Sequence, residues 1–317
     1  MINVELKGGA VKEFENGTTP AEIAKSIGAG LYKSVCCAKV DGDLCDLRTP
    51  LEKDCKVELL TFDNVDGQKT FWHTASHVLA QAVKRLYPNA KCAIGPAVDN
   101  GFYYDFDVEK PFSPEDLEKI KAEMKKIVKS GLELERVELS PEEAEKKLEE
   151  MNEPYKVELV KEHSDKGEHI TFYKQGEFID LCAGPHLMSV APIKAIELTA
   201  CTGAYWRGDA HNAQLCRVYG VAFPKASMLE EHLKKLEEAK LRDHNKLGRE
   251  LEYFTTVDYV GQGLPILLPK GARVVQLLQR WVEDVEQSKG CLLTKTPLLA
   301  KRDLYKISGH WDHYLDG

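Results

Sequence analysis

The first sixty residues show short runs of alternating apolar and polar positions, a pattern typical of strands that bury one face. Residues 3–6 and 10–14 alternate on either side of a Lys-Gly-Gly turn, which predicts a β-hairpin. Thr19 is then followed by Pro20 and, three positions after the threonine, by Glu22. A capping hydroxyl, a proline in the first turn and a returning carboxylate together predict that a helix starts here.

The rest of this segment completes a small α/β module. Gly28 or Gly30 is expected to end the helix. Residues 35–47 alternate around an Asp-Gly pair, which predicts a second hairpin, and residues 57–62 predict a last strand. This order of elements predicts a ubiquitin-like β-grasp module over residues 1–62. No group of catalytic residue types gathers in it, which favours a docking or accessory role.

A helix is expected from about residue 70 to residue 86. Its apolar positions form one stripe, made of Trp72, Ala75, Val78, Leu79, Ala82, Val83 and Leu86. At 100° per residue, His73 and His77 lie roughly 160° from the centre of that stripe. The pattern therefore argues against two core histidines. It leaves two interpretations open, a solvated helix face or a functional pair.

A hairpin is expected over residues 169–182. On its second strand Asp180 and Cys182 alternate onto the same face. The Gly-Pro pair that follows predicts a turn that brings His186 back towards them. Taken alone, Asp180 is typical of a hairpin polar residue and Cys182 of a buried filler.

Charged segments lie between these two parts. Residues 113–130 and 140–151 each begin with a Ser-Pro cap and predict helices with solvated Lys- and Glu-rich faces. Residues 155–160 alternate and predict a strand that carries Lys156. A single lysine on a strand is usually a surface residue.

The two histidine-bearing segments share a spacing. His73 and His77 form an H-x-x-x-H pair, and Cys182 and His186 form a C-x-x-x-H pair. Imidazole and thiolate groups are the usual ligands of zinc and are also groups that handle protons. The sequence therefore offers two hypotheses, one hydrolytic or metal site built from both pairs, or two coincidences of spacing.

The last third of the chain changes character. Residues 224–247 predict a long charged connecting helix that ends at Gly248. Beyond it, a helix is expected over residues 272–289 and a strand over residues 290–299, which contains Pro297. Residues 248–317 make a poor domain alone, so we expect this third domain to be truncated.

Composition narrows the class of protein. A chain of 317 residues with 43% hydrophobic residues predicts two or three domains with ordinary cores. The net charge of −8 excludes a global basic field for nucleic acid, so any nucleic-acid contact must be local. No apolar run is long enough for a membrane span, and the N-terminus has no secretory pattern. Nine scattered cysteines favour reduced thiols and a cytoplasmic protein.

Several short motifs occur in the order found in one family. They are His73-Thr74-Ala75-Ser76-His77, Ala93-Ile94-Gly95-Pro96, residues 99–105, Asp180-Leu181-Cys182-Ala183-Gly184-Pro185-His186, residues 203–209 and residues 242–248. Together they resemble the N-terminal portion of bacterial-type threonyl-tRNA synthetases. The resemblance implies an α+β multidomain chain. It would contain a TGS β-grasp domain (1–62), an editing domain (63–223), a linker helix (224–247) and the truncated start of a class II antiparallel-sheet catalytic domain with motif 1 (248–317).

The resemblance also implies a division of labour. The full-length enzyme would join threonine to tRNA(Thr) with ATP and one zinc ion, both bound by residues beyond 317, and would be a homodimer. Serine lacks one methyl group of threonine, and this difference supplies only about 1–3 kcal/mol of discrimination. The part present here would therefore hydrolyse mischarged seryl-tRNA(Thr).

Roles for single residues follow from the resemblance alone. His73 would transfer the proton, Lys156 would face the ester, and Asp180 would hold the serine ammonium group. Tyr104 would border the pocket near the terminal adenosine. Cys182 and His186 would shape the pocket and orient water without acting as nucleophiles, and His77 would also line it.

A metal is a further question that the resemblance raises. Related alanyl editing domains hold zinc with a comparable set, here His73, His77, Cys182 and His186. Four protein ligands would leave zinc no open position for a water molecule. We therefore expect editing without a metal, with zinc at these residues as the alternative.

Two other functions compete with this one. One is a free-standing trans-editing aminoacyl-tRNA deacylase, which would not need the motif 1 region. The other is a non-catalytic TGS-containing binding protein, although the sequence has no G-x-x-x-x-G-K-[ST] loop. Trp206, Arg207 and Lys270 are candidates for tRNA contacts, for which an ordinary surface is the competing interpretation.

Overall fold

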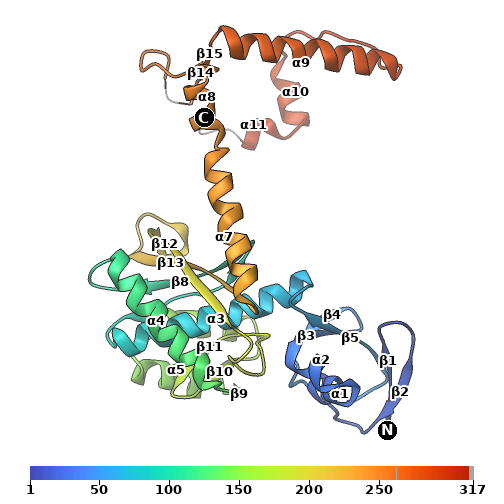
Figure 1. Ribbon diagram of the computed structural model, residues 1–317, viewed down its shortest axis with the longest axis vertical. Coiled ribbons are helices and arrows are strands. Elements are labelled where there is room, and N and C mark those ends of the chain that lie inside the picture. Colours follow the sequence, from blue (N-terminus) through green and yellow to red (C-terminus); the bar gives the residue numbers. More distant parts are fainter. Residues whose placement is uncertain (262, 314–317) are drawn as a thin grey trace. The chain divides into compact units, whose positions relative to one another are not determined.

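The computed structural model of the chain describes residues 1–261 and 263–313, so the end of the predicted 248–317 domain lies outside the described residues. The chain separates into two compact units, residues 1–234 and 235–317 (Figure 1). Strands and helices are mixed in each unit, and the sheets are separate. The predicted α+β multidomain class is confirmed.

The N-terminal module, residues 1–62, contains a five-stranded mixed sheet in the order β2-β1-β5-β3-β4. Its strands are β1 (Ile2–Leu6), β2 (Val11–Phe14), β3 (Val35–Val40), β4 (Asp43–Cys45) and β5 (Cys55–Thr61). Helix α1 (Pro20–Ile27) begins at the predicted cap, where Thr19 and Glu22 exchange side-chain-to-backbone hydrogen bonds. A second short helix, α2 (Ala29–Ser34), was not predicted. The chain becomes helical again directly after Gly28, the residue at which α1 ends.

Helix α3 (Val65–Leu86) forms the centre of the next domain. It starts five residues earlier than predicted, and Asn64 is its N-cap residue. A Cβ atom at Gly67 would lie 1.9 Å from the Thr61 carbonyl oxygen, so only glycine fits this close approach. The Trp72 indole anchors the helix by donating to the Ala222 carbonyl oxygen at 2.8 Å.

One side of α3 packs on a sheet in the order β12-β13-β8-β6, with β7 paired to β8. Its strands are β6 (Lys91–Cys92), β7 (Ala97–Val98), β8 (Gly101–Asp107), β12 (Ala195–Tyr205) and β13 (Gln214–Phe223), with a 3-10 turn at Trp206–Gly208. Helix α4 (Pro114–Ser130) packs against α3 and β12. The predicted Ser113 cap of α4 is confirmed, and its outer face is exposed.

A second sheet has three strands in the order β11-β10-β9. They are β9 (Leu134–Glu138), β10 (Thr171–Gln175) and β11 (Phe178–Leu181), and β10 and β11 form the predicted hairpin. Two helices follow β9, α5 (Pro141–Glu150) and α6 (Pro154–Asp165). The predicted Ser140 cap of α5 is confirmed.

The predicted strand over residues 155–160 is wrong, because this segment lies inside α6. Tyr155, Val157 and Leu159 alternate as in a strand, but Pro154 occupies the first turn of a helix, a position that proline favours. In the helix, Lys156 and Val160 are four residues apart and lie on one buried face.

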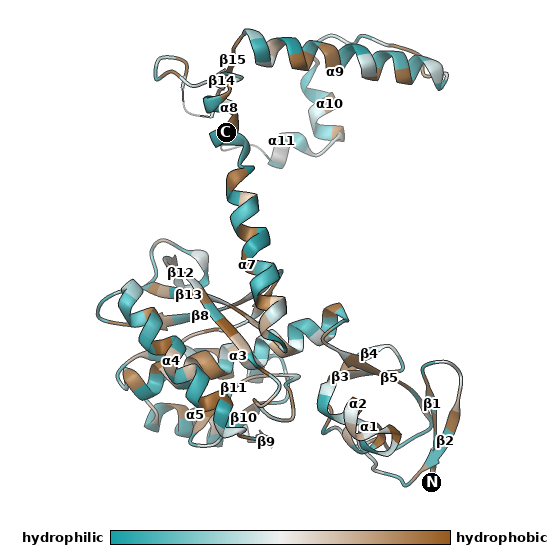
Figure 2. Cartoon of the chain, viewed as in Figure 1, coloured by the Kyte–Doolittle hydropathy of each residue, from teal (hydrophilic) through white to brown (hydrophobic). Residues whose placement is uncertain are grey.

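The second unit contains mainly helices and a two-stranded sheet. Its elements are α8 (His244–Glu250), β14 (Phe254–Thr255), β15 (Ile266–Leu267), α9 (Pro269–Ser288), α10 (Arg302–Ile307) and α11 (His310–His313). Helix α9 carries alternating apolar and polar bands (Figure 2). Its Trp281 side chain is 63% exposed. None of the described helices combines the length and the apolar character that a membrane crossing requires.

Two predictions about the C-terminal third are corrected. The single linker helix is two helices, since α7 (Ala226–Leu241) ends and Asp243 then caps α8 by accepting from the Lys246 backbone N–H at 2.9 Å. The predicted strand over residues 290–299 is irregular chain. Among the described residues, no strand pairs with it, and a strand outside a sheet lacks partners for its backbone groups.

Candidate functional site

The two predicted half-sites meet in space. His73 and His77 lie one turn apart on α3, and Cys182 and His186 lie in the loop that follows β11. One ligand atom from each of the four lies within 4.8 Å of the others. The Cys182 Sγ atom is 3.1 Å from His73 Nε2 and 3.2 Å from His186 Nε2. The spacing of the two pairs is therefore not a coincidence.

The histidine face of α3 is not a solvated face. His77 is 2% exposed and His186 is fully buried, whereas His73 and Cys182 keep part of their surface. The β10–β11 hairpin covers this side of the helix, and the Phe178 ring packs edge-on against His77 with centroids 6.2 Å apart. Because sheets cover α3 on two sides, its apolar stripe did not reveal which residues are buried.

Hydrogen bonds fix the tautomer of His186. The Thr74 hydroxyl donates to the Thr70 carbonyl oxygen at 3.0 Å, so the Thr74 oxygen can only accept from its other partners. It accepts from the Leu187 backbone N–H at 2.9 Å and lies 3.2 Å from His186 Nδ1. His186 Nδ1 must therefore carry the proton. Its Nε2 lone pair faces the Cys182 thiol.

His73 has the same arrangement. One of its ring nitrogens bonds to the backbone of Pro185, and the other, Nε2, faces Cys182. Burial lowers the pKa of His73 to about 4, although the Asp180 carboxylate opposes this shift. Burial, reinforced by the two neighbouring imidazoles, lowers the pKa of His186 well below its usual value. Both rings are therefore neutral at pH 7, and two imidazole lone pairs face one thiol.

A buried charged group lies beside these rings. The Lys156 ammonium is 2.9 Å from Asp180 Oδ1, and the Tyr104 hydroxyl donates to Asp180 Oδ2 at 2.6 Å. His77 Nε2 is 3.7 Å from the same carboxylate. Burial opposes both charges, but their mutual attraction prevails, so the pKa of Lys156 is raised and the pKa of Asp180 is lowered. The pair is ionised at neutral pH.

Tyr104 occupies a different position from the one that the resemblance implied. Its side chain is fully buried, and a Cβ atom at Gly95 would lie 2.1 Å from its ring. The segment around Gly95 is tied to α3 because Ser76 Oγ donates to the Gly95 carbonyl oxygen at 2.6 Å. Tyr104 thus supports Asp180 from beneath the pocket wall and offers no surface for direct contact with an adenosine.

His73, His77, Lys156, Asp180 and Cys182 border one cavity of about 360 Å³. Its rim also contains His163, Glu168 and His169, which the sequence did not single out, and His163 Nδ1 is 2.6 Å from Glu168 Oε2. In a helix, His163 follows Lys156 at i+7 and shares its face. A helical assignment of this segment would have placed His163 at the site together with Lys156.

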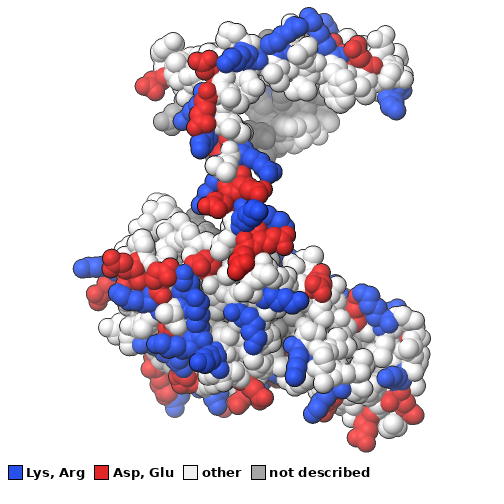
Figure 3. Space-filling model, viewed as in Figure 1, with Lys and Arg blue, Asp and Glu red and all other residues white. Residues whose placement is uncertain are grey.

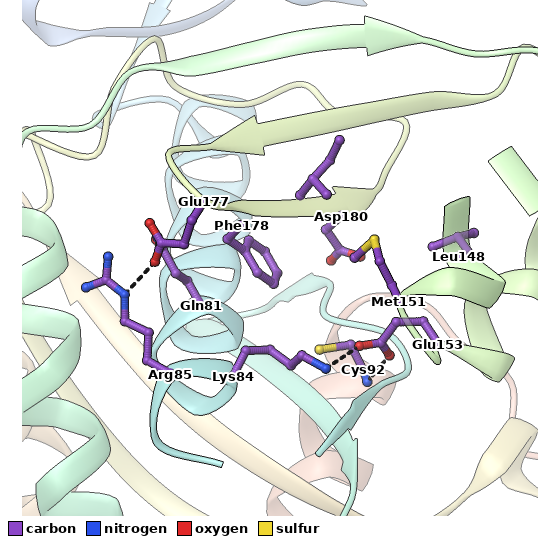
Figure 4. A pocket seen from close by; sticks show the side chains of 11 residues that line it. Gln81, Lys84, Arg85, Cys92, Leu148, Met151, Glu153, Glu177, Phe178 and Asp180 are labelled. Atoms are coloured by element: carbon purple, nitrogen blue, oxygen red, sulfur yellow. Dashed lines mark hydrogen bonds and ion pairs between the residues drawn. The ribbon is translucent and has the colours of Figure 1, made fainter. Parts of the chain in front are cut away.

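Asp180 also borders a second cavity, of about 320 Å³ (Figure 4). Its charged side chains already pair with each other, Lys84 with Glu153 at 2.7 Å and Arg85 with Glu177 at 2.6 Å. None of the four clustered His and Cys side chains lines it. The chemistry therefore belongs to the first cavity.

The candidate tRNA contacts are largely engaged within the chain. Trp206 is 7% exposed and donates to Glu158 Oε2 at 3.1 Å, so its indole is held within the chain and leaves little surface for a tRNA contact. Arg207 pairs with Glu158 at 2.8 Å and with Glu162, and Lys270 lies 3.3 Å from Glu252. Basic and acidic side chains are interspersed on the face seen in Figure 3.

The four-residue cluster has donors that suit a tetrahedral zinc ion. Two neutral imidazoles present Nε2 to the thiol, and the Nδ1 atom of buried His77 has no hydrogen-bond partner among the described residues. Zinc held by His73, His77, Cys182 and His186 would have four protein ligands. It would stabilise the loop but leave no position for an activated water.

Comparisons with known proteins agree with this geometry. Residues 2–61 match the TGS domain family, and residues 170–219 match the family described as the threonyl and alanyl tRNA synthetase second additional domain. The threonine–tRNA ligase of Clostridium perfringens is 59% identical over all 317 residues, and that of Acetivibrio thermocellus is 52% identical over 314 residues. The chain corresponds to the N-terminal portion of bacterial threonyl-tRNA synthetases. It spans 49% of the length of these two relatives.

The extent of the match bears on the competing functions. Similarity to threonine–tRNA ligases continues past residue 223 to the end of the chain. A free-standing deacylase would not need that region, and a TGS-containing regulatory protein would not share the second additional domain. The family membership of these relatives therefore favours an editing-associated region of a synthetase.

Proposed function

We propose that this chain hydrolyses seryl-tRNA(Thr), as the editing part of a threonyl-tRNA synthetase. The observation that carries the proposal is one cavity bordered by a neutral, partly exposed imidazole, His73, and a buried ammonium, Lys156. Ester hydrolysis needs a proton acceptor for the attacking water and a positive charge near the developing oxyanion. Both groups are present.

In the proposed mechanism, His73 Nε2 accepts the proton of the attacking water. This lone pair is unprotonated because the other ring nitrogen is bonded to the Pro185 backbone, and the single proton of the Cys182 thiol can be donated to His186 Nε2 instead. The imidazolium that forms is stabilised by the Asp180 carboxylate, whose charge raises the pKa of His73 against the effect of burial. Proton transfer by a positioned side chain contributes typically about 10²–10⁴-fold in rate.

Lys156 faces the ester as a fixed positive charge. Its ion pair with Asp180 keeps it protonated in a buried position, where an isolated lysine would lose its proton. Asp180 has bonds from Tyr104 and Lys156, one on each oxygen, so each oxygen keeps acceptor capacity for the ammonium group of serine. We assign Tyr104 to the support of Asp180, and His77, Cys182 and His186 to the shape of the wall.

We further propose that editing needs no metal. Stoichiometric zinc in the purified chain, measured by elemental analysis, would contradict this. The full-length protein would use ATP and one zinc ion at residues beyond 317, with threonine and tRNA(Thr) as substrates. It would act as a homodimer in the cytoplasm.

Hydrolysis of seryl-tRNA(Thr) and threonyl-tRNA(Thr) by this chain tests the proposal. We expect hydrolysis of the seryl ester alone, because we propose that the extra methyl group of threonine would overlap the pocket wall. His73→Ala should abolish it, while His211→Ala, an exposed histidine on the β12–β13 connection, should not. Full activity in the His73 variant would exclude the assigned role.

A further inference from the structure

The N-terminal module reaches the wall of the proposed editing cavity through two side chains. Asp46 and Arg48 follow β4, and both are largely buried, with side chains 6% and 15% exposed. They pair with each other at 3.0 Å. No catalytic motif of the sequence includes them, yet both contact His186, which belongs to the four-residue cluster.

The two residues hold His186 by both polar groups of its backbone. Asp46 Oδ2 accepts from the His186 backbone N–H at 3.2 Å. Arg48 Nη1 lies 3.4 Å from the His186 carbonyl oxygen, and Arg48 Nη2 donates to the Leu187 carbonyl oxygen at 2.8 Å. Arg48 Nε donates to Leu134 on β9 at 3.0 Å, which ties the loop to the second sheet. The guanidinium thus bonds to three carbonyl oxygens of the neighbouring domain.

Tyr173 extends the contact to the turn before His186. Its hydroxyl donates to Asp46 Oδ2 at 2.8 Å, and its ring packs edge-on against the His186 ring with centroids 4.4 Å apart. A Cβ atom at Gly184 would lie 2.2 Å from the Tyr173 hydroxyl oxygen. The loop that carries Cys182 and His186 is therefore seated on a tyrosine whose hydroxyl is fixed by the N-terminal module.

We propose that Asp46 and Arg48 are positioning residues of the editing site, by which the N-terminal module fixes the His186 ring and the loop from Cys182 to His186. This inference rests on the proposed editing function. His186 Nε2 sets one side of the Cys182 thiol, and the thiol in turn lies against His73 Nε2. A small displacement of His186 moves the surroundings of the proton acceptor, and errors of about 1 Å in such positions cost on the order of 10²-fold in rate.

Arg48→Lys is the informative variant. It keeps the positive charge and much of the packing but cannot bond to three carbonyl oxygens with one planar fork. Asp46→Asn is a second variant, which keeps the size of the side chain and removes the charge. Arg136→Lys is the matched control, because Arg136 lies on β9 and pairs only with the neighbouring Glu138 among the ion pairs of the described residues, at 2.8 Å.

Two measurements on the full chain test whether Asp46 and Arg48 position His186. In seryl-tRNA hydrolysis, Arg48→Lys should lower kcat by about 10- to 100-fold and leave KM within about twofold, since the residue positions the catalytic groups and does not touch the substrate. The second measurement is NMR of the chain labelled with ¹⁵N-histidine, in which the Nδ1–H signal of His186 is assigned by its loss in His186→Asn. Exchange of this proton with solvent should be faster in both Arg48→Lys and Asp46→Asn. Arg136→Lys should change neither.

The outcomes separate this inference from the proposed function. If the unaltered chain hydrolyses no seryl-tRNA, the function fails, while the exchange measurement still decides whether the two residues hold His186. An unchanged His186 signal in both folded variants, judged by circular dichroism, would overturn the positioning role whatever the kinetics. A loss of activity that appears mainly in KM would overturn it as well.

Discussion

Replacement of Lys156 by methionine should destabilise the chain in a pH-dependent way. The substitution keeps the length of the side chain but leaves the Asp180 carboxylate, 4% exposed, without its ion partner. Removing one member of a buried ion pair costs about 3–5 kcal/mol. The Tyr104 hydroxyl still donates to Asp180 at 2.6 Å, so we expect the lower end, about 3 kcal/mol at pH 7.

The sign of the pH dependence follows from the carboxylate. In the unaltered chain the pKa of Asp180 is lowered by Lys156, so its contribution to stability is present above the pKa of an unfolded aspartate and is lost only in strong acid. In Lys156→Met, burial dominates and raises the pKa of Asp180 above its unfolded value. The variant is then penalised at neutral pH, and protonation of Asp180 removes the penalty as the pH falls. The difference in stability should therefore shrink between pH 7 and pH 5.

Urea unfolding followed by circular dichroism measures this difference at both pH values. Lys174→Met is the control, because Lys174 on β10 pairs with exposed Glu135 at 3.4 Å and should show no measurable change. The double variant with Asp180→Asn should recover part of the loss, since no buried charge remains. Equal stability of Lys156→Met and the unaltered chain at pH 7 would refute the electrostatic account of this pair.

Three further outcomes follow from the same geometry. Cys182→Ala should keep seryl-tRNA hydrolysis within about tenfold and no acyl-enzyme should accumulate, whereas a nucleophilic thiol would make this variant inactive. Gly95→Ala should destabilise the chain by about 1–3 kcal/mol in thermal unfolding, because the new methyl group meets the Tyr104 ring, while Gly30→Ala, with open space around the new methyl group, should not. The rate of hydrolysis should stay level from pH 7 to pH 5 and fall as the pH drops through about 4, where His73 becomes protonated; a fall centred near pH 6.5 would contradict the buried environment of His73.

The elements that could be predicted from sequence are those that depend on near neighbours. The helix starts at Thr19, Ser113 and Ser140 were all confirmed, because a capping box involves residues only three positions apart. The hairpin that carries Asp180 on its second strand was confirmed for the same reason. In these segments the local pattern and the final structure agree.

The errors arose where distant segments decide the structure. The alternation over residues 155–160 fits a strand, but the segment forms a helix after Pro154, and that helix buries Lys156. The strand expected over residues 290–299 would need a pairing partner, and none of the described strands supplies one. The hydrophobic stripe of α3 argued against core histidines on the opposite face, but the β10–β11 hairpin covers that face and buries His77.

The candidate site shows the same division at the level of single groups. Its metal-type and proton-handling side chains stand out in the sequence because each pair lies within one turn or loop, four positions apart. The groups that set the charge and tautomer of these side chains do not stand out in the sequence. Asp46 lies 140 residues before the backbone amide that it accepts from, and Thr74 lies 112 residues before the imidazole that it orients. The spacing of a motif can therefore show which atoms are available for chemistry, whereas their protonation depends on partners that only the fold brings together. This is why the N-terminal module, which carries no catalytic motif, supplies two of the contacts that the proposed chemistry needs.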